Sequence, residues 1–382
     1  MTAALLAGGA IVDPLAGTTA RGDVLSRDGV VAALGAVAPA DASDVERIDV
    51  SGCLLAPGFV DIHAHVFGRP GVASSRLPAD RVGVRQGVAC LVDAGSAGAA
   101  TIDDLPAVVH ATQRTPVYAL VNVGSPGLPE AAGGHSSRPE LVSLEATVRA
   151  VERHRDWVRG VKVQASHSHT GTYGLTAVAV AREAADRTGL PLMMHIGNAP
   201  PALDAALRYL REGDIVTHAY HGKAGGALTS GGAPLPALVE AVARGVIVDV
   251  GHGRSSFAFA TAERALAAGL PVHTISTDIH RGNVDGPVVS LARTMTKLML
   301  LGLSLEQVVR AVTLAPARAL RLDGDGFGTL AVGRPAHVTL FRVRDGPYAL
   351  ADATGEVRVA DRRIEPLAVY VGGERFAVDA PI

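Results

Sequence analysis

The sequence predicts an α/β protein, a (β/α)8 TIM barrel with a small β-sandwich domain formed by both ends of the chain. Three observations support this. The chain has 382 residues, more than one hydrophobic core usually supports. Eight strand-like runs alternate with amphipathic stretches over residues 56–325, the size expected of a (β/α)8 barrel. Short β-like pieces occupy residues 1–55 and 326–382, so we expect these two segments to pair into one β domain.

Turns rich in Gly, Asp and Pro separate the β-like pieces at the two ends. These pieces are Ala3–Ile11, Val24–Leu34, Arg47–Leu55, Gly328–Phe341, Val357–Val359 and Leu367–Val371. The barrel strands are expected at Gly58–His63, Val88–Asp93, Val117–Val123, Gly160–Ala165, Leu192–His195, Ile215–His218, Val246–Val250 and Val272–Thr277. Amphipathic stretches, many closed by Gly, lie at Leu141–Val158, Ala177–Thr188, Pro201–Arg211, Leu235–Ala243 and Ala260–Ala268. An open doubly wound sheet is the structural alternative, but no Gly-x-Gly-x-x-Gly follows the first strand to suggest a dinucleotide site.

Composition narrows the classes of partner. Charged residues make up only 19% of the chain and the net charge is −2, which argues against a nucleic-acid face and a polybasic membrane surface. Cys53 and Cys90 are the only cysteines, too few for a disulfide framework and consistent with a reducing cytosol. The first arginine is Arg21 and no run of 18 apolar residues occurs. We expect a cytoplasmic protein that acts on a small-molecule substrate. Assembly into a homo-oligomer is compatible with these observations.

Pro57–Gly68 places two histidines in alternation at the first barrel strand. Residues i and i+2 of a strand point to the same side, so His63 and His65 converge on one point, as in a metal chelate. Alternatively, they are two satisfied polar residues at a strand end. In a barrel, the chelate would lie at the face that carries active sites.

Lysine is scarce, since only Lys162, Lys223 and Lys297 occur among 35 basic residues. Lys162 lies within an apolar strand, where a charged amine is costly to bury. A neutral amine reacts with carbon dioxide to give a carbamate that could bridge two metals, which an arginine cannot do because it stays protonated. The alternative is a lysine that extends out of the strand or pairs with a carboxylate.

Three further candidates end predicted strands. His195 and His218 end two successive strands, and Asp278 follows the eighth, where a carboxylate can touch a metal and accept a proton. Taken singly, such histidines are more often structural and such an aspartate is a common helix N-cap.

The six residues together resemble the amidohydrolase superfamily of metal-dependent barrel hydrolases, in its binuclear branch with a carboxylated lysine. They occur on strands one, one, four, five, six and eight, and the resemblance covers nearly the whole chain. A narrower resemblance, carried by Asp249–Phe259, Ile275–Asn283 and Gly286–Lys297, is to the dihydroorotase-like amidohydrolase/deacetylase group, which includes acetyl-mandelate-type hydrolases. One departure is His337, where the superfamily's terminal motif usually has Asp.

This resemblance implies a hydroxide that bridges two divalent ions, and we expect these ions to be Zn²⁺. His63, His65 and Asp278 would hold one ion, His195 and His218 the other, with N6-carboxylysine at Lys162 spanning both. Asp278 would act as the catalytic base.

Loop residues after the strands could bind substrate. We select Arg254, His169, Tyr173, Tyr220 and His280. Arg254 is the first choice for a substrate carboxylate, because a guanidinium group can form two parallel hydrogen bonds with it. Arg69 and Arg281 are the next choices for that role. His135, His167, His221 and His252 are further loop candidates.

The predicted function is metal-dependent hydrolysis of an amide or ester bond in a small acylated acid, either an N-acyl amino acid or an O-acyl 2-hydroxy acid. A cyclic-amide hydrolase of the dihydroorotase or hydantoinase type shares the metal centre and stays open as an alternative. A mononuclear deaminase would not need Lys162. A catalytically inactive scaffold is a different class, and the six intact candidate ligands argue against it.

Overall fold

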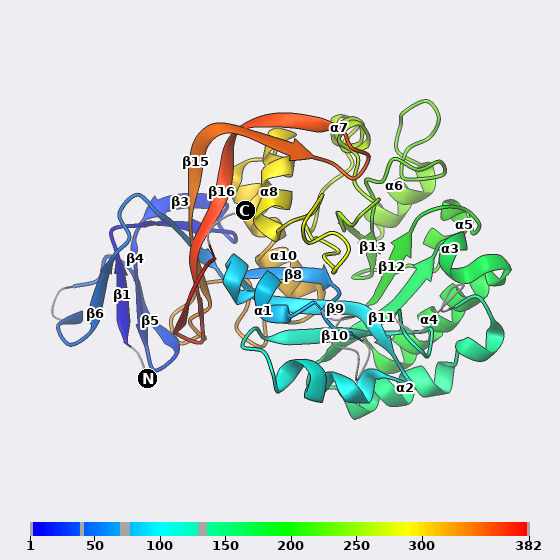
Figure 1. Ribbon diagram of the computed structural model, residues 1–382, viewed down its shortest axis with the longest axis horizontal. Helices are drawn as coiled ribbons and strands as arrows, with labels where there is room; N and C mark the ends of the chain where they lie inside the picture. Colours follow the sequence, from blue (N-terminus) through cyan, green and yellow to red (C-terminus); the bar gives the residue numbers. More distant parts are fainter. Residues whose placement is uncertain (1–2, 39–41, 69–76, 129–135, 380–382) are drawn as a thin grey trace.

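The computed structural model describes residues 3–38, 42–68, 77–128 and 136–379. Figure 1 shows two parts, a β-rich part that carries the N-terminus and an α/β part built around a curled sheet. A long hairpin, β15–β16, starts in the β-rich part and arches over the barrel side. Arg69 and His135 lie outside the described residues.

The α/β part is a barrel of parallel strands. Its sheet has seven regular strands in the described residues, in the order β14-β13-β12-β11-β10-β9-β8, and every neighbouring pair is parallel. These strands are β8 (Phe59–Ala64), β9 (Val88–Gly98), β10 (Val117–Asn122), β11 (Val158–Ala165), β12 (Leu192–Ile196), β13 (Ile215–Thr217) and β14 (Ile247–Asp249). Every residue of β8 and β9 is buried, which is why these strands read as nearly continuous apolar runs.

The eighth predicted strand, Val272–Thr277, is wrong as a regular strand. The segment nevertheless closes the barrel through two parallel bridges, Asp249 to Thr274 and Ala64 to Ile279. Backbone hydrogen bonds also join it to the chain after β14, since the N–H groups of Val250 and His252 donate to the carbonyls of Thr274 and Ser276. The hydroxyls of Thr274 and Ser276 add hydrogen bonds to Asp249.

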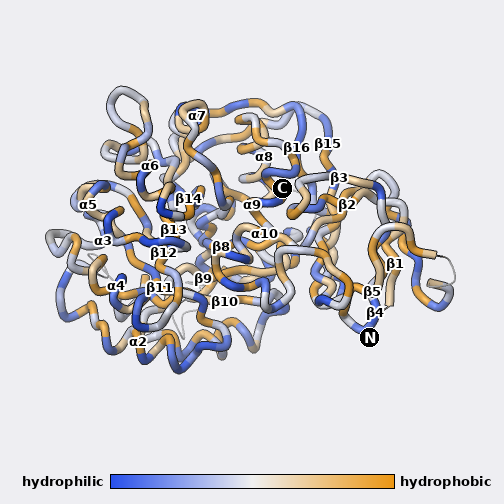
Figure 2. The backbone as a smooth tube through the Cα atoms, turned by 180° about the vertical axis from the view of Figure 1, so that it is seen from behind, coloured by the Kyte–Doolittle hydropathy of each residue, from blue (hydrophilic) through white to orange (hydrophobic). Residues whose placement is uncertain are grey.

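Helices surround the barrel strands, and the short α3 (His167–Thr170) lies at the barrel mouth. They are α1 (Ala79–Val82), α2 (Leu144–Arg153), α3 (His167–Thr170), α4 (Leu175–Thr188), α5 (Leu203–Leu207), α6 (Pro236–Ala243), α7 (Phe259–Ala267), α8 (Leu291–Leu300), α9 (Leu305–Ala311) and α10 (Leu314–Ala319). Short turns of other helix types are η3 (Val84–Gln86), η4 (Ile102–Asp104), η5 (Pro106–His110), η6 (Pro139–Leu141) and η7 (Gly171–Tyr173). Figure 2 shows hydrophobic and hydrophilic residues alternating along α2 and α4, as expected for helices with one packed face.

The β-rich part is a sandwich of two sheets. One sheet has the order β5-β4-β1-β6 and the other β17-β16-β15-β7-β2-β3. The strands are β1 (Ala4–Ala7), β2 (Ala10–Asp13), β3 (Thr18–Arg21), β4 (Asp23–Arg27), β5 (Val30–Gly35), β6 (Glu46–Asp49), β7 (Leu54–Pro57), β15 (Val338–Ala351), β16 (Val357–Val371) and β17 (Glu374–Ala377). A shared core with Leu6, Val24, Leu55, Val338 and Tyr370 joins the two sheets.

Strand β7 is the link between the chain ends. It pairs with β2 on one side and with β15 on the other, so residues before and after the barrel share one sheet. This pairing supports the division that we propose, a β domain of residues 1–55 and 326–382 around a barrel domain of residues 56–325.

Candidate metal centre

His63 and His65 lie at the carboxyl end of β8, and each ring is held by a hydroxyl. His63 Nδ1 is 3.0 Å from Thr217 Oγ1, and His65 Nδ1 is 2.8 Å from Ser96 Oγ. Both contacts use Nδ1, so the Nε2 atom of each ring is left to face the centre of the barrel mouth. Burial, reinforced by Lys162, lowers the pKa of His63 well below its ordinary value, which keeps its imidazole in the neutral form that binds metals.

Lys162 reaches the same point from β11. Its Nζ lies 3.1 Å from His63 Nε2 and 3.2 Å from Met193 Sδ, and its side chain is buried. Burial lowers the pKa of Lys162 to about 8, against the opposing effects of Asp278, Asp249 and Asp93. Near neutral pH, an appreciable fraction of this amine is therefore unprotonated and nucleophilic.

His195 and His218 come from the next two strands. His195 lies within β12 and His218 directly follows β13, and their ring centroids are 4.3 Å apart. His218 Nδ1 is 2.5 Å from the Gly251 carbonyl oxygen, which leaves Nε2 for the barrel mouth. This Nε2 is buried and has no hydrogen-bond partner among the described residues. A buried imidazole nitrogen without a protein partner needs another partner, and a metal ion is one that suits it.

Asp278 faces these rings from the segment that closes the barrel. Its Oδ1 lies 3.0 Å from His65 Nε2 and 3.5 Å from His63 Nε2, and its Oδ2 lies 3.9 Å from His218 Nε2. Burial by itself would raise the pKa of Asp278, but the hydrogen bond with His65 and the neighbouring His218 lower it to about 2. Asp278 is thus an ionised carboxylate at neutral pH, able to bind a cation or accept a proton.

Ligand atoms of His63, His218 and Asp278 all lie within 4.8 Å of one another, a spacing that could hold a metal ion. Imidazole nitrogen and carboxylate oxygen are donors that zinc accepts readily. His218 and Asp278 both have positive φ, 72° and 49°, a costly conformation for residues other than glycine that clusters at functional sites. The donor set and the orphan Nε2 of His218 fit a divalent metal.

Two buried aspartates support the histidines from behind. Asp249 accepts hydrogen bonds from the hydroxyls of Thr217, Thr274 and Ser276 at 2.6 to 2.7 Å, and Thr217 is the residue that contacts His63. Asp93 accepts from the backbone of Val66, Phe67 and Ser96.

Sequence reasoning did not select Asp93 or Asp249. A usable signal exists, because each is an acidic residue at the end of an apolar strand run, in Leu91–Asp93 and Val248–Asp249.

The metal candidates open into a cavity of about 460 Å³. Its lining contains His63, His65, Lys162, His195 and Asp278 of the six predicted ligands, together with Phe67, Ser96, Leu128, Gln164, His169, His280 and Arg281. Two of the selected substrate-binding residues, His169 and His280, therefore line this cavity, as does Arg281.

The other selected residues do not line it. Tyr220 is fully buried, its hydroxyl donates to the Pro271 carbonyl, and its side chain is not part of the cavity lining. Arg254 is exposed outside the cavity lining, and Tyr173 packs partly buried against the hydrophobic core.

A second buried lysine lies close to the centre. Lys297 Nζ is 2.7 Å from His252 Nε2 and donates to the Pro287 carbonyl at 2.9 Å. His252 stacks on Phe257 and precedes Gly253, whose added Cβ would lie 2.4 Å from Asp278 Oδ2. The Lys297–His252 pair therefore fixes the backbone against which Asp278 packs. His167 is exposed and His221 is buried, and neither lines the cavity.

Within the residues that the structure describes, no helix combines the length and the apolarity needed to cross a membrane.

Comparison with known proteins shows the family. The model of the amidohydrolase family matches residues 54–375. A protein named deacetylase from Agrobacterium fabrum is 35% identical over 359 residues, which cover 93% of this chain and 86% of that protein. A deacetylase from Enterococcus faecalis is 32% identical, with 93% and 95% covered.

Solved structures agree with this result. A crystal structure titled as a dihydroorotase matches with a TM-score of 0.89 and 33% identity, and covers 100% of this chain and 99% of that one. A structure titled as an adenine deaminase matches with a TM-score of 0.90 and 31% identity, with 99% and 100% covered. The barrel, the histidines and carboxylate at its mouth and these similarities have one explanation: the chain belongs to the amidohydrolase family and is a hydrolase of C–N bonds.

Proposed function

We propose that this protein hydrolyses the amide or ester bond of a small acylated acid, either an N-acyl amino acid or an O-acyl 2-hydroxy acid. The observation that carries the proposal is the grouping of His63, His218 and Asp278 beside Lys162 at one end of the barrel. The deacetylase names of relatives at 35% and 32% identity point to an acyl substrate.

We assign the six predicted ligands to two divalent ions, most simply Zn²⁺. His63, His65 and Asp278 would hold one ion and His195 and His218 the other, with Lys162 as N6-carboxylysine between them. Bound ions would lower the pKa of water and polarise the scissile carbonyl. The cavity at the barrel mouth is large enough for a small substrate in contact with all of these groups except His218.

Asp278 is the proposed catalytic base. Its carboxylate is ionised at neutral pH and lies at the cavity, so it can take the proton of the attacking water and pass it to the departing nitrogen or oxygen. Arg281 is our first choice for the substrate carboxylate because it lines the cavity, whereas Arg254 does not. His169 and His280 line the same cavity and would contact the acyl or acid part.

Cyclic-amide hydrolysis is the second candidate. It is favoured by the structure titled as a dihydroorotase, which matches 100% of this chain at 33% identity. Cyclic-amide hydrolysis would use the same metal ligands and would differ in the substrate that the loops around the cavity accept.

Metal content tests the binuclear centre. We expect about two metal ions per chain in the purified protein, with a sharp fall in Lys162→Ala. The Lys223→Ala variant removes another lysine that is no proposed ligand and should retain the metal. One ion per chain, unchanged in Lys162→Ala, would overturn the assignment of Lys162.

A substrate screen tests the reaction. At least one of the two acyl classes, N-acyl amino acids or O-acetyl hydroxy acids, should be turned over, and dihydroorotate and hydantoins should not. Turnover of the cyclic amides alone would establish the second candidate, and no turnover of any acyl compound would reject the first.

A further inference from the structure

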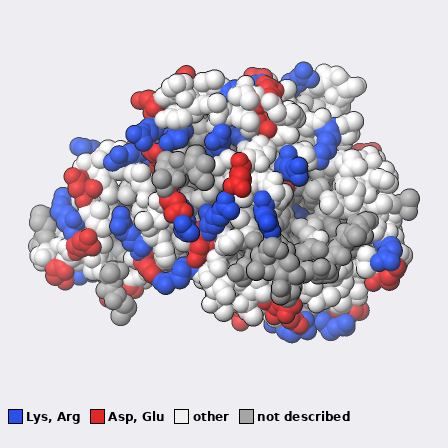
Figure 3. Space-filling model, viewed as in Figure 1, with Lys and Arg blue, Asp and Glu red and all other residues white. Residues whose placement is uncertain are grey.

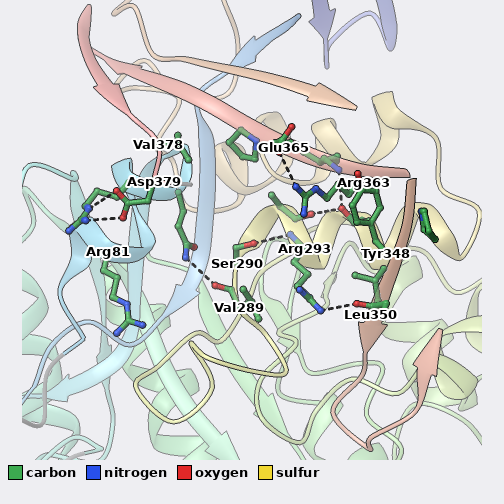
Figure 4. A pocket seen from close by; sticks show the side chains of 18 residues that line it. Arg81, Val289, Ser290, Arg293, Tyr348, Leu350, Arg363, Glu365, Val378 and Asp379 are labelled. Atoms are coloured by element: carbon green, nitrogen blue, oxygen red, sulfur yellow. Dashed lines mark hydrogen bonds and ion pairs between the residues drawn. The ribbon is translucent and has the colours of Figure 1, made fainter. Parts of the chain in front are cut away.

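A second cavity lies outside the barrel, between α8, the β15–β16 hairpin and the segment that runs from α1 to η3. Its volume is about 270 Å³, near the lower end for small-molecule pockets. Figure 4 shows Arg293 on α8 reaching toward the hairpin beside Leu350, with Tyr348 and Arg363 above it and with Arg81 and Asp379 across the cavity. None of its lining residues lines the cavity at the metal centre.

The walls carry more positive than negative charge. Four arginines, Arg81, Arg85, Arg293 and Arg363, line the cavity together with the acids Glu365 and Asp379. Figure 3 shows basic side chains gathered around the middle of this face of the molecule.

Three of these arginines have a carboxylate partner. Arg81 pairs with Asp285 at 2.8 Å, Arg85 with Asp379 at 2.9 Å and Arg363 with Glu365 at 2.9 Å.

Arg293 has no carboxylate partner among the described residues. Its guanidinium donates a single hydrogen bond there, from Nη2 to the Ala349 carbonyl at 2.9 Å. Its Nε is buried without an acceptor in the same part of the chain. Glu365 does not compensate it, because that carboxylate is shared by Arg363 and Arg344. A half-buried cation with spare donors recognises a planar anion well, because a guanidinium bonds a carboxylate through two parallel contacts.

Part of the remaining wall is apolar, beside the polar side chains of Gln86, Ser290 and Thr296. Pro347, Leu350, Ile364 and Pro366 line the cavity beside the ring of Tyr348, on which Arg363 stacks at 4.6 Å. Such walls favour a ligand with an apolar body over a bare inorganic anion, because they gain free energy only when apolar surface is removed from water.

We propose that this cavity binds a small organic carboxylate, with its carboxylate on Arg293 and its apolar body against Tyr348 and the proline-lined walls. The ligand would contact both the barrel helix α8 and the β15–β16 hairpin. Because it binds the folded state across two elements, it should also raise the midpoint of thermal unfolding.

Benzoate and phenylacetate are suitable probes, tested on the purified, metal-loaded protein by titration calorimetry and thermal unfolding. We expect saturable binding of at least one of them and a rise in the unfolding midpoint. Benzyl alcohol, which lacks the charge, and sulfate, which lacks the apolar body, should bind at least tenfold more weakly.

Three variants locate the binding. Arg293→Gln should weaken it at least tenfold, whereas Arg264→Gln, which alters an exposed arginine outside the cavity lining, should leave it unchanged. Arg281→Gln tests the catalytic cavity. Binding that is lost in Arg281→Gln and kept in Arg293→Gln would assign the carboxylate to the metal centre and overturn the proposal. Absence of saturable binding of both probes at millimolar concentration would also overturn it.

Discussion

Thr217 is the residue through which the barrel interior is expected to control metal affinity. Its hydroxyl has one hydrogen, which it donates to Asp249 Oδ2 at 2.6 Å, so its oxygen must accept the Nδ1–H of His63 at 3.0 Å. This arrangement fixes the tautomer of His63 that presents the lone pair of Nε2 to the proposed metal. Outer contacts of this kind typically change metal affinity by about 10- to 100-fold.

The substitution Thr217→Val removes the hydroxyl and keeps the shape of the side chain. We expect metal affinity to fall by about 10- to 100-fold, or about 1.4 to 2.7 kcal/mol. Loss of the buried hydrogen bond to a carboxylate should also destabilise the fold by about 1.5 to 3 kcal/mol. The loss of metal affinity is specific to the metal centre, whereas a loss of stability is expected for any buried hydroxyl that donates to a carboxylate.

Thr274→Val is the matched control. Thr274 is equally buried and donates to the other oxygen of Asp249 at 2.7 Å, but no hydrogen bond joins it to His63. Both variants should lose stability in thermal unfolding of the metal-free protein, and Thr217→Val should lose more because it also leaves His63 Nδ1 without its partner. Only Thr217→Val should lose metal during titration with a chelator. Equal metal affinity in the two variants would refute the reasoning that Thr217 acts through His63.

Two further predictions concern the pair Lys297–His252 and the glycine beside Asp278. Burial, with Arg293 nearby, lowers the pKa of Lys297 from 10.5 to about 7, against the opposing effect of Asp352. Between these two pH values the unfolded chain binds a proton that the folded chain does not, so folding stability should rise with pH by up to about 1.4 kcal/mol per unit. Chemical unfolding between pH 7 and 9 should show this rise relative to Lys297→Met, and parallel pH profiles would contradict it. Gly253→Ala should lower kcat by about 100-fold, because its Cβ would lie 2.4 Å from Asp278 Oδ2 and displace the proposed base. The control Gly269→Ala has a similar positive φ, 82°, but nothing within 4 Å, so it should lose stability and retain kcat.

The barrel architecture could be predicted from the sequence because its signals are local. Seven of the eight predicted strands form, since each is an apolar run whose burial on both faces demands such residues. The eighth is wrong as a regular strand, since isolated bridges and the hydroxyls of Thr274 and Ser276 on Asp249 join the segment to the barrel. These contacts are made with residues 25 or more positions away, which the local pattern does not contain.

Helix lengths were less well predicted than strands. The stretch Pro201–Arg211 forms only the short helix α5, Leu203–Leu207, while Ala177–Thr188 lies within α4. Helix ends depend on capping and tertiary packing that a periodic pattern does not contain.

The order of His63, His65, Lys162, His195, His218 and Asp278 along the chain was enough to predict that these side chains meet at one end of the barrel, because parallel strands bring their carboxyl ends to one face. The tertiary structure alone decided which loop residues accompany them. It assigned His169, His280 and Arg281 to the cavity, left Arg254 outside it and buried Tyr220. Loop side chains have no period that fixes their direction, and the arginine cavity beside α8 likewise exists only because the distant hairpin β15–β16 folds over that helix.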